Sequence, residues 1–126
     1  MSGSVNKVTL LGRLGQDPEA REMQNGGKLI QLSVATSERW RDKASGEPRE
    51  RTEWHRVVIF NQRLADVAET YLSKGDLVYL EGQLRTSKWI DESCHERFTT
   101  EVVLPRFGGV LTLLGRRDDD ATEEAA

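Results

Sequence analysis

A chain of 126 residues is long enough to bury a real core as one domain without metal ions or disulfides. Its single cysteine excludes an internal disulfide, and no apolar run reaches the roughly 20 residues that cross a bilayer. The N-terminal MSGSVNKV lacks the apolar core of a secretory signal, so we expect a protein of the cytoplasm.

The charge is unevenly distributed along the chain. There are 18 Lys and Arg against 21 Asp and Glu, a net charge of −3. Five of the acids lie in residues 118–126, DDDATEEAA, which contain no base, so the preceding body has 18 basic against 16 acidic side chains. This weakly basic balance permits a nucleic-acid partner without indicating one. We expect a domain over residues 1–115 and a short, disordered acidic tail over 116–126.

Strand signals alternate with turn signals along the first half of the chain. Residues 5–15 predict a strand that ends in a glycine-punctuated turn, and NGGK at 25–28 predicts a second turn. Residues 29–40 alternate apolar with polar or small side chains, the period of a half-buried strand. The polar residues 41–50 predict an exposed loop or hairpin tip, after which 52–60 return as a strand.

The second half contains the one convincing helix. Apolar residues recur at helical spacing through 61–75, and Gly75 supplies the stop. Strand signals resume at 76–86 and 97–104, on either side of a polar segment, and 109–115 predict a last short strand. A helix between the third and fourth strands is the element order of the OB-fold, so we predict an all-β, five-stranded Greek-key barrel with one helix. Element order alone leaves another small α+β fold open.

The strand TEWHRVVIF has two different faces. Because side chains alternate across a strand, one face holds Trp54, Arg56, Val58 and Phe60, and the other holds His55, Val57 and Ile59. The second face is an ordinary core stripe, whereas burying the first would leave a guanidinium without a partner. Rings that stack on bases of any identity, with cations that follow the phosphates, suit flexible single strands of nucleic acid.

The other two tryptophans, Trp40 and Trp89, also lie among charged residues, with cations within three positions. Core tryptophans normally have apolar neighbours, so three exceptions together favour an exposed stacking surface. Each tryptophan taken singly is more often partly buried structure, and the pattern leaves both interpretations open.

Enzyme signatures are missing from the sequence. Cys94 and His95 are adjacent and His55 is the only other histidine, which gives neither zinc-ligand spacing nor a nucleophile pair with an orienting group. NGGK lacks the spacing of a phosphate-binding P-loop. We therefore expect no enzyme activity, no metal site and no cofactor. An RNA-binding or protein-interaction module stays open beside a DNA-binding one.

Several long motifs, in order, resemble one known family. VNKVTLLGRLGQDPE, NGGK, VATSERWRDKASGE, TEWHRVVIF, YLSKGDLVYLEGQLRT and KWIDE are similar to segments of the bacterial single-stranded DNA-binding protein family, from about Val5 to Gly115. The resemblance implies an OB-fold homotetramer around which single-stranded DNA wraps, with little regard to sequence, during replication, recombination and repair.

The resemblance also implies roles for particular residues. The stacking aromatics would be Trp40, Trp54, Phe60 and Trp89. The cations along the DNA would be Lys43, Arg56, Lys74, Arg85 and Lys88, with a further cation shifted to Arg63. The subunit interface would include His55, Tyr79 and Gln83.

The sequence departs from the family pattern in two ways. Ser73 and Ser87 stand where relatives often have a base, which predicts an altered affinity or binding mode. Relatives usually end in a long flexible linker and an acidic tip closing in Pro-Phe, whereas this sequence ends in DDDATEEAA. We therefore expect weak recruitment of replication and repair proteins through such a tip.

Overall fold

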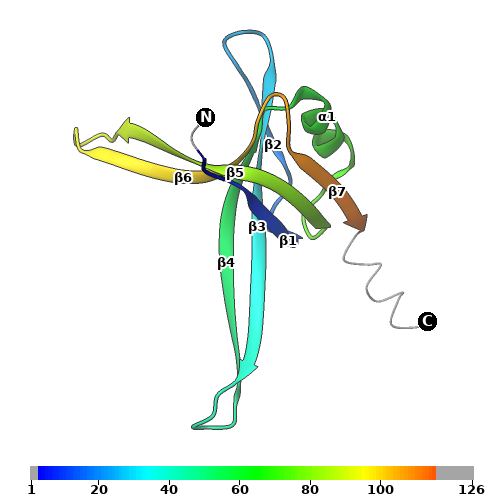
Figure 1. The fold of residues 1–126 in the computed structure, drawn as a ribbon, viewed down its shortest axis with the longest axis vertical. Coiled ribbons are helices and arrows are strands. Elements are labelled where there is room, and N and C mark those ends of the chain that lie inside the picture. The colour runs from blue at the N-terminus through cyan, green and yellow to red at the C-terminus, as the bar shows by residue number, and fades with distance from the viewer. Residues whose placement is uncertain (1–2, 116–126) are drawn as a thin grey trace.

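Seven strands and one helix lie within residues 3–115, the part of the chain that the computed structural model describes (Figure 1). The strands are β1 (Val8–Leu14), β2 (Glu19–Glu22), β3 (Lys28–Arg41), β4 (Pro48–Ile59), β5 (Leu77–Ile90), β6 (Glu96–Leu104) and β7 (Val110–Gly115). The helix α1 (Gln62–Tyr71) connects β4 to β5. The tail expected over 116–126 lies outside the described residues.

Five of the strands close into a barrel. Their order is β1-β3-β4-β6-β5, and β5 pairs again with β1. β4 and β6 run parallel, while the other neighbours in the barrel are antiparallel. β2 pairs with β3 and β7 pairs with β5, outside this closed path. Because α1 lies between the third and fourth barrel strands, the predicted OB-fold is confirmed.

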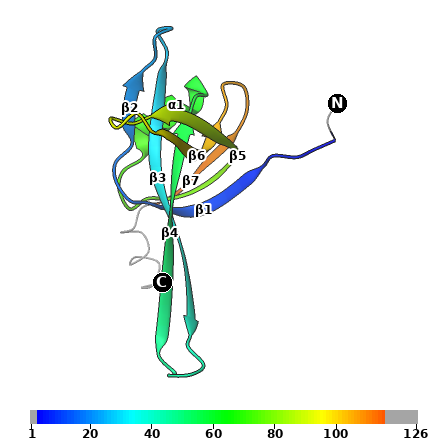
Figure 2. The ribbon, with the colours of Figure 1, turned by 90° about the vertical axis from the view of Figure 1, so that its left-hand side faces the viewer.

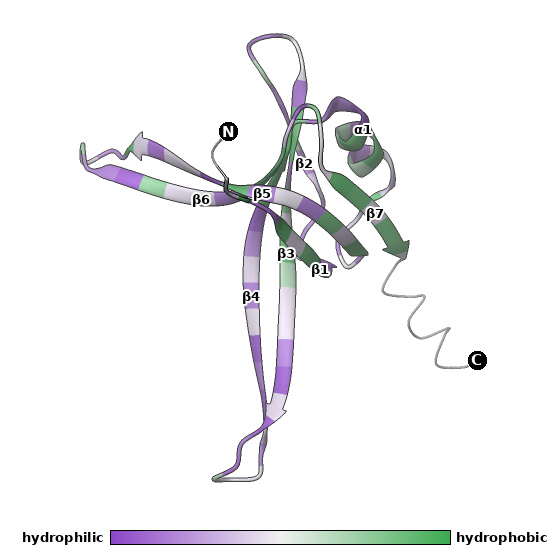
Figure 3. Cartoon of the chain, viewed as in Figure 1, coloured by the Kyte–Doolittle hydropathy of each residue, from purple (hydrophilic) through white to green (hydrophobic). Residues whose placement is uncertain are grey.

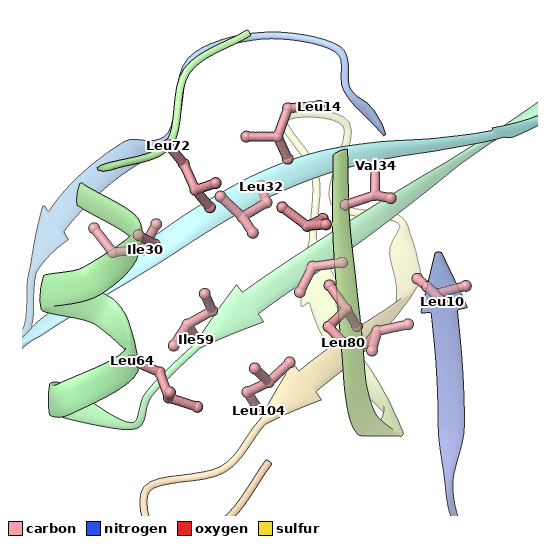
Figure 4. Packing of buried hydrophobic residues seen from close by; sticks show 14 of the residues in the cluster. Leu10, Leu14, Ile30, Leu32, Val34, Ile59, Leu64, Leu72, Leu80 and Leu104 are labelled. Atoms are coloured by element: carbon pink, nitrogen blue, oxygen red, sulfur yellow. The ribbon is translucent and has the colours of Figure 1, made fainter. Parts of the chain in front are cut away.

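The interior of the barrel is aliphatic (Figure 4). Alternate residues of the strands point inward, and α1 covers one end of the barrel with its own apolar side chains. The buried core consists of Leu10, Leu14, Ile30, Leu32, Val34, Val57, Ile59, Leu64, Ala65, Ala68, Leu72, Val78, Leu80, Val102 and Leu104. Complete burial of one large aliphatic side chain is worth roughly 1.5–3 kcal/mol, so this cluster is the main source of stability.

The helix is shorter than its sequence pattern predicts. Asn61 caps it, since its Oδ1 accepts a hydrogen bond from the Leu64 N–H at 3.2 Å. The helix ends at Tyr71 rather than at Gly75, and the N–H of Leu72 closes the last turn on the Ala68 carbonyl at 3.0 Å. Gly75, with φ of +94°, forms the turn into β5. Within residues 3–115, no helix has the length and apolar character that a membrane crossing needs.

Two long hairpins project from the barrel in different directions (Figures 1 and 2). We call residues 36–54 the β3–β4 arm and residues 84–100 the β5–β6 arm. Both arms are mostly polar along their length (Figure 3). Backbone pairing continues far along them, so that only 42–47 and 91–95 remain as hairpin tips.

The strands of the arms extend further than the sequence predicts, and one strand was not predicted. The loop or hairpin tip expected at 41–50 is a hairpin tip over 42–47, shorter than predicted because β3 and β4 stay paired as far as Arg41 and Pro48. Half of the polar segment 87–96 is strand, because β5 and β6 stay paired as far as Ile90 and Glu96. β2 was not expected at all: its residues EARE show no apolar alternation, and pairing with β3 holds them extended.

Candidate nucleic-acid interface

β4 separates its two sets of side chains as the sequence predicts. Val57 and Ile59 are fully buried in the barrel, whereas Trp54 points outward with 62% of its surface exposed. The exception is Val58, which shares the outer side with Trp54 but is only 3% exposed. It lies beside Val103 of the parallel strand β6, which is also buried. The outer face of β4 is thus open near the arm and covered near the barrel.

The ring of Trp54 lies against the backbone at Gly15. A Cβ atom added to Gly15 would collide with the six-membered ring of the indole. Gly15 is itself held in place, because its N–H donates to the Ser33 carbonyl at 2.8 Å. Glycine at this position therefore lets the ring lie close against the backbone while most of its surface stays open to solvent.

An open groove of about 1100 Å³ lies beside Trp54. Its lining includes Arg13 from β1, Arg39 from the β3–β4 arm and Lys74 from the loop after α1. One carboxylate, that of Glu50, also lines it and accepts a hydrogen bond from Arg39 Nε at 2.6 Å. Three cations and one anion around an exposed ring give a surface that can hold a phosphate beside a stacked base.

Trp89 lies on the β5–β6 arm, half exposed. Its Nε1–H donates to Thr99 Oγ1 at 2.8 Å, across the hairpin. Along β5, Trp89 lies two residues beyond Ser87 and four beyond Arg85. The side chains of Arg85 and Trp89 therefore share one face of the strand. The indole is therefore fixed at one edge while its face stays available for stacking.

Phe60 follows β4 directly and pairs with a cation. The Arg85 guanidinium carbon lies 5.7 Å from the centre of the Phe60 ring, within cation–π distance. Both side chains line a pocket of about 290 Å³, together with Gln62, Arg106 and others. We call Trp54, Arg56, Phe60, Arg85 and Trp89 the aromatic face.

A carboxylate lies within the aromatic face. Glu101 of β6 is the strand partner of Arg85, and its Oε2 lies 2.7 Å from Arg56 Nε. The Glu101 side chain is only 15% exposed, while that of Arg56 is 52% exposed. The ion pair therefore fixes Arg56 on the surface and offsets part of its charge.

Two predicted residues lie away from the aromatic face. Trp40 has the same parity along β3 as the buried Val34, so it occupies the face of the arm opposite Trp54. Lys88 likewise alternates with Trp89, and its Nζ pairs with Glu96 at 3.1 Å on the far side of the β5–β6 arm. A strand of DNA that contacted both sets would have to pass around the arms.

The remaining predicted cations are exposed at separate places. Lys74 lines the groove beside Trp54, and its backbone N–H donates to Asp17 Oδ1 at 2.8 Å. Lys43 lies in the tip of the β3–β4 arm, and Arg63 lies in the first turn of α1. Of these three, the structure brings only Lys74 together with a predicted aromatic, Trp54.

The residues predicted for a subunit interface fall on two surfaces. His55 is half buried at the base of the β3–β4 arm, and its Nε2 lies 2.8 Å from Thr36 Oγ1. Tyr79 points outward from β5, and its hydroxyl donates to Glu81. This bond raises the pKa of Tyr79 and, ahead of the contribution of Lys7, lowers the pKa of Glu81. Gln83 is half buried two residues further along the same side of β5.

Several residues of the interface were not predicted from the sequence. Gly15, Arg39, Thr99, Glu101 and Arg106 all line or position it. The sequence offered a signal for Arg39, because its side chain alternates with that of Trp40 along β3. No group of His, Cys, Asp and Glu among residues 3–115 could hold a metal ion.

Comparison with known proteins identifies a family, and the similar solved structures include a complex with DNA. Residues 5–108 match the single-strand binding protein family. The solved structure of the Plasmodium falciparum SSB in complex with ssDNA is 37% identical in sequence, with a TM-score of 0.80 over 90% of this chain and 98% of that chain. The range that matches the family includes every side chain of the aromatic face.

Proposed function

This chain belongs to the single-strand binding protein family and binds single-stranded DNA, and we propose that the bases stack on its exposed aromatic rings while Lys and Arg contact the phosphates. The family is one of DNA-binding proteins, not of enzymes. The rings we assign to stacking are Trp40, Trp54, Phe60 and Trp89, and the cations are Lys43, Arg56, Arg63, Lys74, Arg85 and Lys88.

One observation carries this proposal: the Trp54 ring, supported from below by Gly15 and open above, beside a groove with three cations. A ring in this position contributes little to the stability of the barrel, because most of its surface remains in water. It is well placed for a flat ligand that carries negative charge on one side. A nucleotide of a single strand has this shape and charge.

A fluorescence titration tests the proposal. Oligo(dT) should quench the tryptophan emission, and log K should fall linearly with log[salt], by about 0.7 per phosphate neutralised. Mixed-sequence oligomers should bind with similar affinity, because stacking is tolerant of base identity. Unquenched emission, or binding that does not respond to salt, would contradict the proposed contacts.

The preference for DNA over RNA needs its own measurement, since stacking and phosphate contacts serve both. We expect oligo(dT) to bind more tightly than oligo(U) at the same salt concentration. Equal affinities would mean that the aromatic face does not distinguish the two sugars.

We further propose that the chain acts as a DNA-wrapping homotetramer. The outer side of β1, β5 and β7 supports a contact between copies, because Tyr79 pairs there with the exposed Leu11 (56%) of β1, and β7 adds the exposed Leu114 (49%). Replacing the half-buried His55 by Tyr should weaken assembly, and DNA binding should then be lost only at low protein concentration. Light scattering that gives the wild-type mass for His55→Tyr at micromolar dilution would reject the role of this histidine.

The cellular role we propose follows from sequence-tolerant binding. Replication, recombination and repair all expose single strands, and a protein that covers them without reading their sequence protects them in each process. We place this work in the cytoplasm, at the nucleoid. A strain depleted of the protein should accumulate unprotected single strands during replication.

A further inference from the structure

The turn between β6 and β7, residues 105–109, carries an exposed aromatic ring. Phe107 is 89% exposed, more than any other large hydrophobic side chain of the described residues. The turn lies beside the start of α1, away from both hairpin tips (Figure 1). Phe107 belongs neither to the buried core nor to the aromatic face.

Hydrogen bonds fix this turn next to Phe60. The Phe60 N–H donates to the Leu104 carbonyl at 2.9 Å, just before the turn. The Asn61 side-chain amide donates to the Gly108 carbonyl at 3.0 Å, just after Phe107. Both sides of the turn are therefore tied to consecutive residues, so Phe107 has a defined position relative to the ring of Phe60.

Each of the two phenylalanines has its own guanidinium. The Arg106 guanidinium carbon lies 5.4 Å from the centre of the Phe107 ring, as that of Arg85 lies 5.7 Å from Phe60. Arg85, Arg106 and Phe60 line the same pocket of about 290 Å³. No carboxylate lines this pocket among the described residues, in contrast to the groove beside Trp54.

We propose that Phe107 and Arg106 form a further nucleotide site, next to the one at Phe60, so that one single strand runs from the aromatic face onto the β6–β7 turn. A phosphate would lie in the pocket between the guanidinium groups of Arg85 and Arg106. The following base would stack on Phe107. This inference rests on the proposed stacking of bases at Phe60 and extends it by one nucleotide.

The charges favour a nucleic acid over a second protein surface as the occupant. A protein partner would cover an exposed phenylalanine with apolar side chains, and it would have to bury or pair two arginine side chains that line an adjacent pocket. A phosphate accepts charge-assisted hydrogen bonds from both without that cost. A base can at the same time stack on the open ring.

The test compares Phe107→Ala with a matched control, Tyr71→Ala. Tyr71 is also an exposed aromatic, at 64%, but it lies at the far end of α1. Fluorescein-labelled oligo(dT) would be titrated by anisotropy at low salt. Phe107→Ala should lose at least fivefold in affinity, the lower limit for one stacked base, and Phe107→Tyr should restore it. Tyr71→Ala should bind like the wild type.

Two further measurements use the same proteins. Arg106→Gln should reduce the slope of log K against log[salt] by about 0.7, the loss of one phosphate contact. An oligomer containing 5-iododeoxyuridine should cross-link to Phe107 on irradiation, as mapped by mass spectrometry. Cross-links confined to the tryptophans and Phe60 would overturn the inference.

The outcomes separate this inference from the proposed function. If wild-type emission is quenched by oligo(dT) but Phe107→Ala binds as tightly as Tyr71→Ala, only the additional site is wrong. If the wild type shows no quenching, the proposed function fails first. A lower mass of Phe107→Ala by light scattering, at concentrations where the wild type is assembled, would overturn the inference by making Phe107 a subunit contact.

Discussion

The barrel and the two arms obtain their structure from different interactions. Barrel strands bury aliphatic side chains on one another and on α1, whereas the arms expose nearly all of their side chains (Figure 3). The arms are held by backbone pairing and by cross-strand contacts such as Ser37 Oγ to Thr52 Oγ1 at 2.9 Å and Thr86 Oγ1 to Thr100 Oγ1 at 3.0 Å. Such pairs contribute roughly 0.2–1 kcal/mol each.

This difference shows where a small domain can place binding groups. All three tryptophans lie on the arms, and each has about half or more of its surface in water. Changing them should therefore alter binding with little effect on folding. Changing the barrel should do the reverse, and the following predictions test that separation from the largest effect to the smallest.

The largest effect should come from the barrel core. Ile59→Ala removes a fully buried side chain between β3 and α1, so it should lower the free energy of unfolding by about 2–5 kcal/mol. Urea denaturation measures this loss. Ile59→Val, the matched control, should cost only about 0.5–1.5 kcal/mol. The DNA affinity of the fraction that remains folded should match that of the wild type. A loss of affinity in that fraction would contradict the separation of stability in the barrel from binding on the arms.

The next largest effect should come from the support beneath Trp54. Gly15→Ala places a methyl group against the indole, so the ring must move and the stacked base should be lost, at about 1–3 kcal/mol of affinity for oligo(dT). A double-mutant cycle isolates the cause. Gly15→Ala should cost no further affinity in a Trp54→Ala background. Additive losses would mean that Gly15 acts on DNA in another way.

A smaller gain of affinity should follow from removing the carboxylate within the aromatic face. Glu101→Gln frees Arg56 from its ion pair and removes a negative charge close to the phosphates, so affinity at low salt should rise several-fold. The gain should shrink as salt screens it, with a Debye length of about 10 Å at 0.1 M. Glu69→Gln is the matched control, since Glu69 of α1 pairs with Lys28, and neither residue belongs to the proposed DNA contacts. An equal gain in both variants would mean that the change of net charge, and not the release of Arg56, raises the affinity.

The smallest effect concerns the arm tips, which are built alike. Asp42 accepts from the Ala44 N–H at 3.1 Å and pairs with Arg49, and Asp91 accepts from the Ser93 N–H at 2.9 Å and pairs with Arg97 at 2.7 Å. The Arg97 guanidinium, followed by the His95 N–H, lowers the pKa of Asp91.

A lowered carboxyl pKa gives a definite sign for the pH dependence of the tip. Asp91 stabilises the tip fully above its unfolded pKa of about 3.9, and this contribution is lost as the pH falls through the lower folded value. The amide resonance of His95 should therefore titrate with a midpoint below 3.9 in an NMR pH series. Asp91→Asn should abolish that titration and leave oligo(dT) binding at pH 7 unchanged within twofold. A midpoint above 3.9 would contradict the charge arrangement of the tip.

Much of the barrel could be predicted from the sequence, because its strands follow the apolar alternation that burial imposes. The faces of β4 and the position of α1 were predicted for this reason. The outer parts of the arms were not, since residues 48–51 and 87–90 have no apolar pattern, and their strand conformation depends on pairing with the opposite chain segment. The burial of Val58 depends on Val103, 45 positions away in the sequence but adjacent in the sheet.

The candidate site divides in the same way. The sequence pattern around Trp54, and the resemblance to a family, were enough to identify candidate rings and cations. Strand parity could also have separated Trp40 from Trp54 and Lys88 from Trp89, because it requires only the continuation of each strand. The contact of Gly15 with Trp54 and the pair of Glu101 with Arg56 could not be predicted, because each joins different strands or loops of the closed barrel.

The most direct test of the separation between arms and barrel measures both the DNA affinity and the free energy of unfolding of a single variant. The double variant Trp54→Ala/Trp89→Ala should lose about 2–6 kcal/mol of affinity for labelled oligo(dT) at low salt, from two stacked bases at about 1–3 kcal/mol each. Its free energy of unfolding in urea should stay within about 0.5 kcal/mol of the wild type, as for surface substitutions generally. Affinity within twofold of the wild type, or an unfolding free energy lowered as far as in Ile59→Ala, would contradict the account.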